Sequence, residues 1–248
     1  MYSSMVPSGP SWTGRRLDLI ATAFFALYLA GVSASDSTAV DRAIWFPDKP
    51  IQAAYEWSYA PCEACVPVAP QRDWQKMQQL AGLSSVHFLV ASGDQWGDAY
   101  SFAPNAVVLS RSAMKLPRCQ LDFVIGHEMV HLAMHDFDED AHSVAVLSGF
   151  RPGWTQNGSL ALSLLDGDYR LAIQMSPIWM EQERRADWVG ALLSAQGGGC
   201  QIQEGALAYL TKQAGYGGGI GAAHEVNSAR ARFLEGFSEP AARLAARW

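Results

Sequence analysis

The sequence has no excess of positive charge and few charged residues of either sign. Its 18 lysines and arginines stand against 24 aspartates and glutamates, so the formal net charge of the 248 residues is −6. A chain with this balance lacks the basic surface that nucleic-acid binding requires, and we exclude that function. Hydrophobic residues make up 49% of the chain, which is enough for a folded core and argues against global disorder.

Long apolar runs are also missing. No stretch reaches the roughly 20 apolar residues of a membrane-spanning helix. The nearest approach is the segment 17–30, which follows two arginines and is itself followed by small residues up to Ala34. This layout is typical of a secretory signal peptide, here residues 1–34, and predicts a periplasmic or secreted protein. The alternative is an uncleaved segment, residues 17–34, that anchors the chain in a membrane.

Cysteine is scarce, with four residues at positions 62, 65, 119 and 200. In an exported protein their default use is in disulfides, and four cysteines allow three pairings. The Cys-x-x-Cys pair could also be a redox pair or half of a zinc site, but a zinc site of this kind would need a second such pair, which the sequence lacks. We favour the pairings Cys62–Cys65 and Cys119–Cys200.

The rest of the chain reads as one domain. Residues 35–70 are rich in proline and aromatic residues without a sustained period, so we expect an irregular N-terminal segment before a domain at 71–248. Hydrophobic spacing predicts an α+β, mostly helical fold. Serine and proline at 176 and 177 predict the start of a new helix. The expected helices cover 71–81, 118–135, 168–175, 177–196, 206–214 and 222–237, and the expected strands 86–91 and 106–109.

The motif His127-Glu128-Met129-Val130-His131 lies in the expected helix 118–135. That helix is apolar nearly all round, which predicts that it is buried. Residues four apart share a helical face, so the two imidazoles can converge on one ion. Catalytic zinc takes three protein ligands and a water, and Glu128, rotated by about 100°, can reach the water. A charged glutamate in an apolar helix is costly unless it has such a task.

A third ligand is expected from the helix 177–196. There Glu183 and Asp187 lie four residues apart, on one helical face. Glu183 can complete the ligand set, and Asp187 can hold a ligand imidazole through its second nitrogen. Alone, Glu183 would be read as a solvated charge in a charged run, but beside the histidine pair we favour the ligand role.

Together these residues resemble the HtpX and CAAX-prenyl-protease type of zinc metallopeptidase, a gluzincin family, over residues 72 to 237. That family shows a strand pair, then His-Glu-x-x-His, then Glu-x-x-x-Asp. Its Asn-Ala-(Phe/Tyr) segment is matched by Asp98-Ala99-Tyr100, with aspartate for asparagine. The resemblance implies a zincin-like fold with a small sheet beside the active-site helix. It also implies one zinc ion, held by the two motif histidines and Glu183.

The same resemblance implies roles for the remaining site residues. Glu128 would be the catalytic base and Asp187 would lie behind the ligands. His224 and Arg230 resemble a late His-Pro…Arg segment, although Glu225 replaces the proline. Both are candidates, with Tyr100, for stabilising the oxyanion of the transition state. His224 could equally be a plain surface histidine, or a residue that approaches the metal and gates it.

Two further expectations concern the surroundings of the motif. Substrates of zinc peptidases usually bind along an edge strand, for which residues 105–110 are the candidate. The cluster Asp136, Asp138, Glu139 and Asp140 lacks the glycine and spacing of an EF-hand loop, so we expect a solvated acidic turn. His135 is expected at a helix end beside it.

The favoured function is a zinc-dependent endopeptidase that hydrolyses peptide bonds in exported or misfolded proteins. The alternative is a catalytically silent zinc-binding module that acts as a chaperone or scaffold, against which the retention of Glu128 argues. A peptidoglycan-directed metalloenzyme ranks third, since such sites use other histidine and aspartate spacings. The expected partners are protein or peptide substrates, and the sequence does not give the oligomeric state.

Overall fold

The computed structural model describes residues 55–57, 65–92, 98–151, 154–215, 217 and 225–245. All of them belong to the unit Asp48–Trp248. Four sequence predictions therefore lie outside the described residues: the signal peptide at 1–34, most of the irregular segment 35–70, the pairing of Cys62 with Cys65, and the role of His224. Within the described ranges, none of the helices combines the length and the apolar character that crossing a membrane requires.

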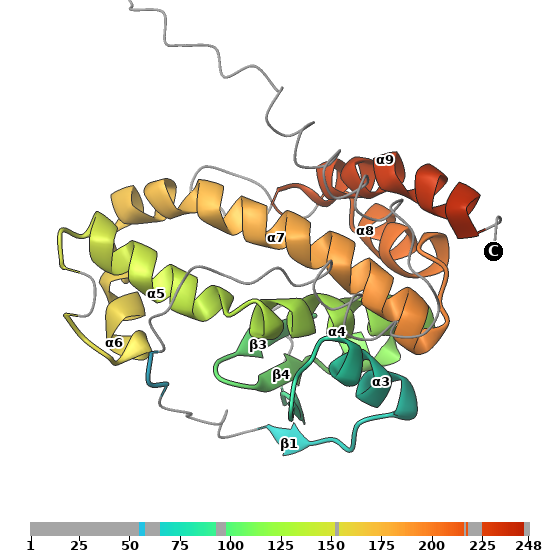
Figure 1. The fold of residues 1–248 in the computed structure, drawn as a ribbon, viewed down its shortest axis with the longest axis horizontal. Helices are drawn as coiled ribbons and strands as arrows, with labels where there is room; N and C mark the ends of the chain where they lie inside the picture. Colours follow the sequence, from blue (N-terminus) through green and yellow to red (C-terminus); the bar gives the residue numbers. More distant parts are fainter. Residues whose placement is uncertain are drawn as a thin grey trace, which may run out of the picture. The chain divides into compact units, whose positions relative to one another are not determined.

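The predicted α+β class, mostly helical with a small sheet, is confirmed (Figure 1). Two helices dominate, α4 (Arg118–Ala133) and α7 (Tyr169–Gly198). The sheet has the strand order β1-β2-β4-β3. In the described ranges the other helices are α3 (Arg72–Leu80), α5 (Asp136–Leu147), α6 (Gly158–Leu162), α8 (Ala208–Lys212) and α9 (Asn227–Ala245), with short 3-10 turns at Ala113–Lys115 and Ser163–Leu165 and a π-helical turn at Gln203–Leu207.

The sheet corrects one prediction. It is built from β1 (Val66–Pro67), β2 (His87–Val90), β3 (Ala99–Phe102) and β4 (Ala106–Leu109). Strand β4 pairs with β2 in parallel and with β3 in antiparallel fashion, so the prediction that residues 105–110 form the edge strand is wrong. All four residues of β4 are buried, as its apolar sequence requires of a central strand. In the described part of the chain, the edge beside β4 is β3.

Helix α4 is the centre of the domain. Every residue from Leu121 to Val130 is buried, the motif glutamate included. Helix α4 contacts α7 and also strands β3 and β4 (Figure 1). The prediction of a buried helix is therefore confirmed, and its polar residues need partners within the protein.

Two sequence predictions about helix boundaries are wrong. Residues 168–196 form one helix, because Pro177 lies within α7 instead of starting a new helix. Proline has no backbone N–H, so one carbonyl in the preceding turn of α7 lacks its helical hydrogen bond. Because Pro177 is exposed, that carbonyl can bond to water instead. Residues 136–140 do not form a solvated turn: they open α5, and Asp136 is only 3% exposed.

A disulfide joins Cys119 to Cys200, as predicted. Cys119 lies in the first turn of α4, and Cys200 comes directly after the end of α7. The bond therefore fastens the start of one long helix to the end of the other.

The two long helices touch at a pair of glycines beside the motif. A Cβ atom on Gly126 would lie 2.8 Å from the carbonyl oxygen of Gly190, and one on Gly190 would lie 2.6 Å from the backbone nitrogen of His127. Both distances are shorter than a carbon atom tolerates, and the obstructing atoms are backbone. The absence of side chains at this crossing thus lets α7 approach the motif closely.

We expect Gly190→Ala to lower the free energy of unfolding by about 1–3 kcal/mol, because the added methyl group overpacks the helix crossing. Denaturant unfolding measures this change. The matched control is Gly236→Ala in α9, where a Cβ would meet no atom within 4 Å. That variant should be neutral or slightly more stable, because alanine favours a helix over glycine by roughly 0.5–1 kcal/mol. Equal effects of the two substitutions would contradict the proposed role of the crossing.

Candidate metal centre

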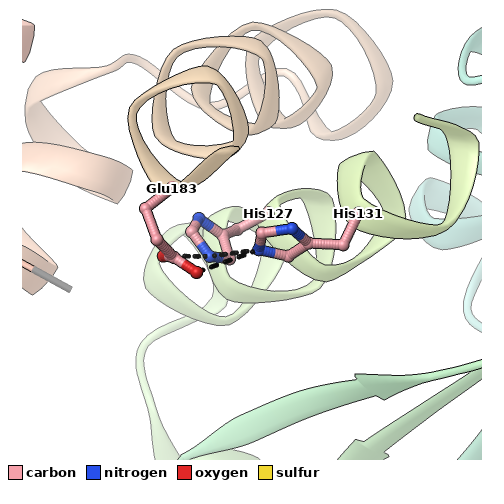
Figure 2. A group of neighbouring side chains, drawn as sticks. All are labelled: His127, His131 and Glu183. Atoms are coloured by element: carbon pink, nitrogen blue, oxygen red, sulfur yellow. Dashed lines mark hydrogen bonds and ion pairs between the residues drawn. The ribbon is translucent and has the colours of Figure 1, made fainter. Parts of the chain in front are cut away.

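Three potential metal ligands meet where α7 crosses α4. His127 and His131 lie on successive turns of α4, and Glu183 reaches them from α7 (Figure 2). The Nε2 atoms of the two imidazoles lie 3.1 Å apart. The Glu183 carboxylate oxygens lie 3.2 Å from His127 Nε2 and 3.3 Å from His131 Nε2. One ligand atom from each residue falls within 4.8 Å of the others, so the three could hold one metal ion.

The other ring nitrogen of His127 faces a buried carboxylate. His127 Nδ1 lies 3.1 Å from Asp187 Oδ1, and Asp187 is fully buried one turn after Glu183. The guanidinium of Arg230, from α9, donates to both oxygens of Asp187 at 2.7 and 2.6 Å. Asp187 and Arg230, both singled out in the sequence, thus lie behind His127. Arg230 also lies 3.6 Å from Glu183, so it faces the cluster.

The other ring nitrogen of His131 has a similar pair, which the sequence analysis missed. His131 Nδ1 lies 2.8 Å from Asp136 Oδ2. Arg185 donates to Asp136 Oδ1 at 2.7 Å. The sequence predicts a solvated acidic turn at Asp136 and assigns no role to Arg185. The one available signal was the position of Asp136, five residues after a motif histidine.

These partners orient the two imidazoles. In each ring Nδ1 faces a carboxylate, and Nε2 faces Glu183. The two Nε2 atoms and the Glu183 carboxylate oxygens lie 3.1–3.3 Å from one another, so they could share one cation.

The pKa shifts of the three potential ligands reflect the charges that surround them. Burial alone lowers the pKa of His127, but the nearby Glu183 and Asp187 carboxylates outweigh it and raise the pKa to about 9. Burial likewise lowers the pKa of His131, while Glu183 and Asp136 together raise it well above its usual value. Burial raises the pKa of Glu183, yet the two histidines hold it well below its ordinary range. The site therefore favours a positive charge among these three side chains.

Glu128 follows His127 on α4 and is 8% exposed. Burial, the Asp98 carboxylate and, to a smaller extent, Glu128 raise the pKa of Tyr209. Tyr209 packs on Phe123, which packs on the His127 ring. Glu128 therefore lies within electrostatic reach of Tyr209.

The remaining candidates for stabilising the oxyanion are Tyr100 and His224. Tyr100 is half-buried in the edge strand β3, and His224 lies outside the described residues. Asp98, at the start of β3, accepts hydrogen bonds from the Tyr209 hydroxyl at 2.9 Å and from Gln213 Nε2 at 2.7 Å. These bonds tie the beginning of the edge strand to α8 and the turn after it.

With this geometry established, comparison with known families gives one match. The family model of peptidase family M48 matches residues 71–237. The chain belongs to peptidase family M48. Membership confirms the predicted resemblance at the level of the family and implies metallopeptidase activity. No curated protein and no solved structure matches the chain significantly.

As an M48 peptidase, the protein is metal-dependent and acts on proteins or peptides. The side chains present fit that requirement, because two imidazole nitrogens and one carboxylate converge. The other nitrogen of each imidazole contacts a carboxylate. The predicted zincin-like arrangement, a small sheet beside the motif helix, is also what the fold shows.

Proposed function

We propose that the protein is a zinc endopeptidase whose ion is held by His127, His131 and Glu183. The observation that carries this proposal is the convergence of two imidazole nitrogens and one carboxylate from two helices. A set of two imidazoles and one carboxylate suits zinc better than calcium or magnesium, which prefer oxygen ligands. Three protein ligands are also the number that catalytic zinc sites use.

In the proposed mechanism, His127, His131 and Glu183 would hold the zinc ion, which when bound would supply Lewis acidity to a water molecule and to the scissile carbonyl. Glu128 accepts the proton of the attacking water and returns it to the leaving amine. Asp187 and Asp136 hold the two ligand imidazoles in the required tautomer. Burial of the motif keeps bulk water from weakening these interactions.

For the substrate we propose β-strand addition to β3. Strand β3 contacts α4. In the described sheet it is the edge strand and pairs with the buried β4. An extended peptide would gain main-chain hydrogen bonds along such an edge whatever its side chains. A segment must be unfolded or exposed to be read in this way, which favours misfolded or exported proteins as substrates.

We further propose that the protein works outside the cytoplasm. The disulfide Cys119–Cys200 supports this, because structural disulfides persist in oxidising compartments. The segment 17–34 would direct export, either as part of a cleaved signal or as a membrane anchor.

Metal content and proteolysis, measured on the same preparation, test the proposed function. We expect about one zinc ion per chain and cleavage of an unfolded protein such as casein. A chelator should reduce cleavage to background, and added zinc should restore it. Zinc binding without cleavage would favour the silent chaperone or scaffold module. A protein that binds no transition metal would contradict the proposal entirely.

A further inference from the structure

Asp136 and Arg185 form an ion pair directly behind His131. We propose that Asp136, held by Arg185, is a positioning residue that orients the His131 imidazole and thereby sets the affinity of the site for its metal. This inference rests on the proposed function, since it requires a metal at His131. It adds two residues to those that the motifs single out and makes α5 part of the site.

Both oxygens of Asp136 are engaged. Oδ2 lies 2.8 Å from His131 Nδ1, and Oδ1 lies 2.7 Å from a guanidinium nitrogen of Arg185. The Asp136 side chain is 4% exposed. Rotation of this carboxylate would break at least one charged hydrogen bond away from water, which is unfavourable. The imidazole it contacts is therefore held with Nε2 aimed at Glu183 and His127.

The backbone is shaped to allow this contact. Five residues further along a continuous helix, a side chain points about 140° away from the starting one. Asp136 could not return to His131 if α4 simply continued. His135 breaks the helix, with φ of 55° in the left-handed region, and Asp136 is the first residue of α5. Non-glycine residues adopt this conformation uncommonly, histidine more readily than most, so the break has an energetic cost that the ion pair offsets.

The pair has a counterpart on the other ligand. His127 is backed by Asp187 and Arg230 in the same order of imidazole, carboxylate and guanidinium. Helix α7 contributes to both arrangements: Asp187 to the first and Arg185 to the second. Since Glu183 lies on the same helix, a shift of α7 would disturb all three potential ligands at once. Arg185 also lies 3.7 Å from Glu139, which makes a second ion pair between α7 and α5.

The test is the zinc affinity of two variants, measured by competition with a chromophoric chelator. Asp136→Asn keeps the shape of the side chain but removes the charge. We expect its zinc dissociation constant to rise about 10–100-fold, the usual effect of losing a carboxylate behind a ligand histidine. Arg185→Met frees Asp136 to rotate but leaves its charge in place, so we expect a smaller rise of about 3–10-fold.

The matched control is Arg184→Met. Arg184 is the neighbour of Arg185 on α7 but pairs with Glu225, away from His131. Its variant should bind zinc within about two-fold of the wild-type protein, as expected of a partly exposed pair. Thermal unfolding of the metal-free proteins separates a local effect from general destabilisation. The visible spectrum of the cobalt-substituted proteins reports directly on ligand geometry; it should change in Asp136→Asn, change less in Arg185→Met, and stay the same in Arg184→Met.

The outcomes separate this inference from the proposed function. If the wild-type protein binds no zinc, the proposed function fails first. If the wild-type protein binds zinc and both variants bind it equally tightly, the positioning role is wrong and the proposed function stands. Should Asp136→Asn fail to fold, Arg185→Met decides alone: wild-type affinity in that variant overturns the inference.

Discussion

Replacement of Glu128 by glutamine is expected to lower kcat/KM for peptide hydrolysis by about 10²–10⁴-fold, the range typical of a lost general base. Glutamine has the shape of glutamate but cannot accept the proton of the attacking water. Glu128 is 8% exposed and follows His127 on the buried motif helix. Because the site is buried, few other proton acceptors can replace it. The zinc content should remain that of the wild-type protein, because Glu128 is not among the three converging ligands.

The measurement is the rate of peptide cleavage together with zinc content. Glu181→Gln, an exposed glutamate on α7, is the matched control and should keep wild-type activity. Thermal unfolding adds an independent check: loss of a buried charge should leave the stability of Glu128→Gln at or above that of the wild type. Near-normal hydrolysis by a zinc-loaded Glu128→Gln protein would assign the proton transfer to another residue.

Local periodicity explains which parts of the site could be predicted. His127 and His131 lie one turn apart on a helix, as do Glu183 and Asp187, and spacing alone places each pair on one face. The convergence of the two helices was expected because each needed a buried partner. The disulfide Cys119–Cys200 was chosen among three pairings and is present.

Features set by tertiary contacts could not be predicted in this way. Asp136 reaches His131 because of the left-handed residue His135, and no pattern in the sequence marks that conformation. Pro177 is a strong local start signal, but packing of α7 against α4 and α5 overrides it. Strand β3 has four residues of mixed composition, so its sequence does not indicate a strand. Because β3 pairs with β4, β4 is a central strand and not the predicted edge.

Removal of the disulfide Cys119–Cys200 is expected to lower the free energy of unfolding by about 4 kcal/mol. The two cysteines are 81 residues apart, and the loop they close contains both helices of the metal site. Without the bond, the unfolded chain gains the entropy of this long loop. In the folded state, the first turn of α4 also loses its covalent tie to the end of α7.

The double variant Cys119→Ala/Cys200→Ala, compared with the oxidised wild-type protein in denaturant, measures this effect without a reducing agent. Cys200 is buried, so part of the loss would come from the smaller side chain; a reduced wild-type sample keeps both sulfur atoms and isolates the contribution of the bond. A loss below about 1 kcal/mol in both comparisons would mean that the loop is restrained in the unfolded state by other means. Since the proposed zinc site exists only in the folded chain, saturating zinc should recover part of the lost stability. Recovery in the double variant but not in its Glu183→Gln derivative would show that metal and disulfide secure the same pair of helices.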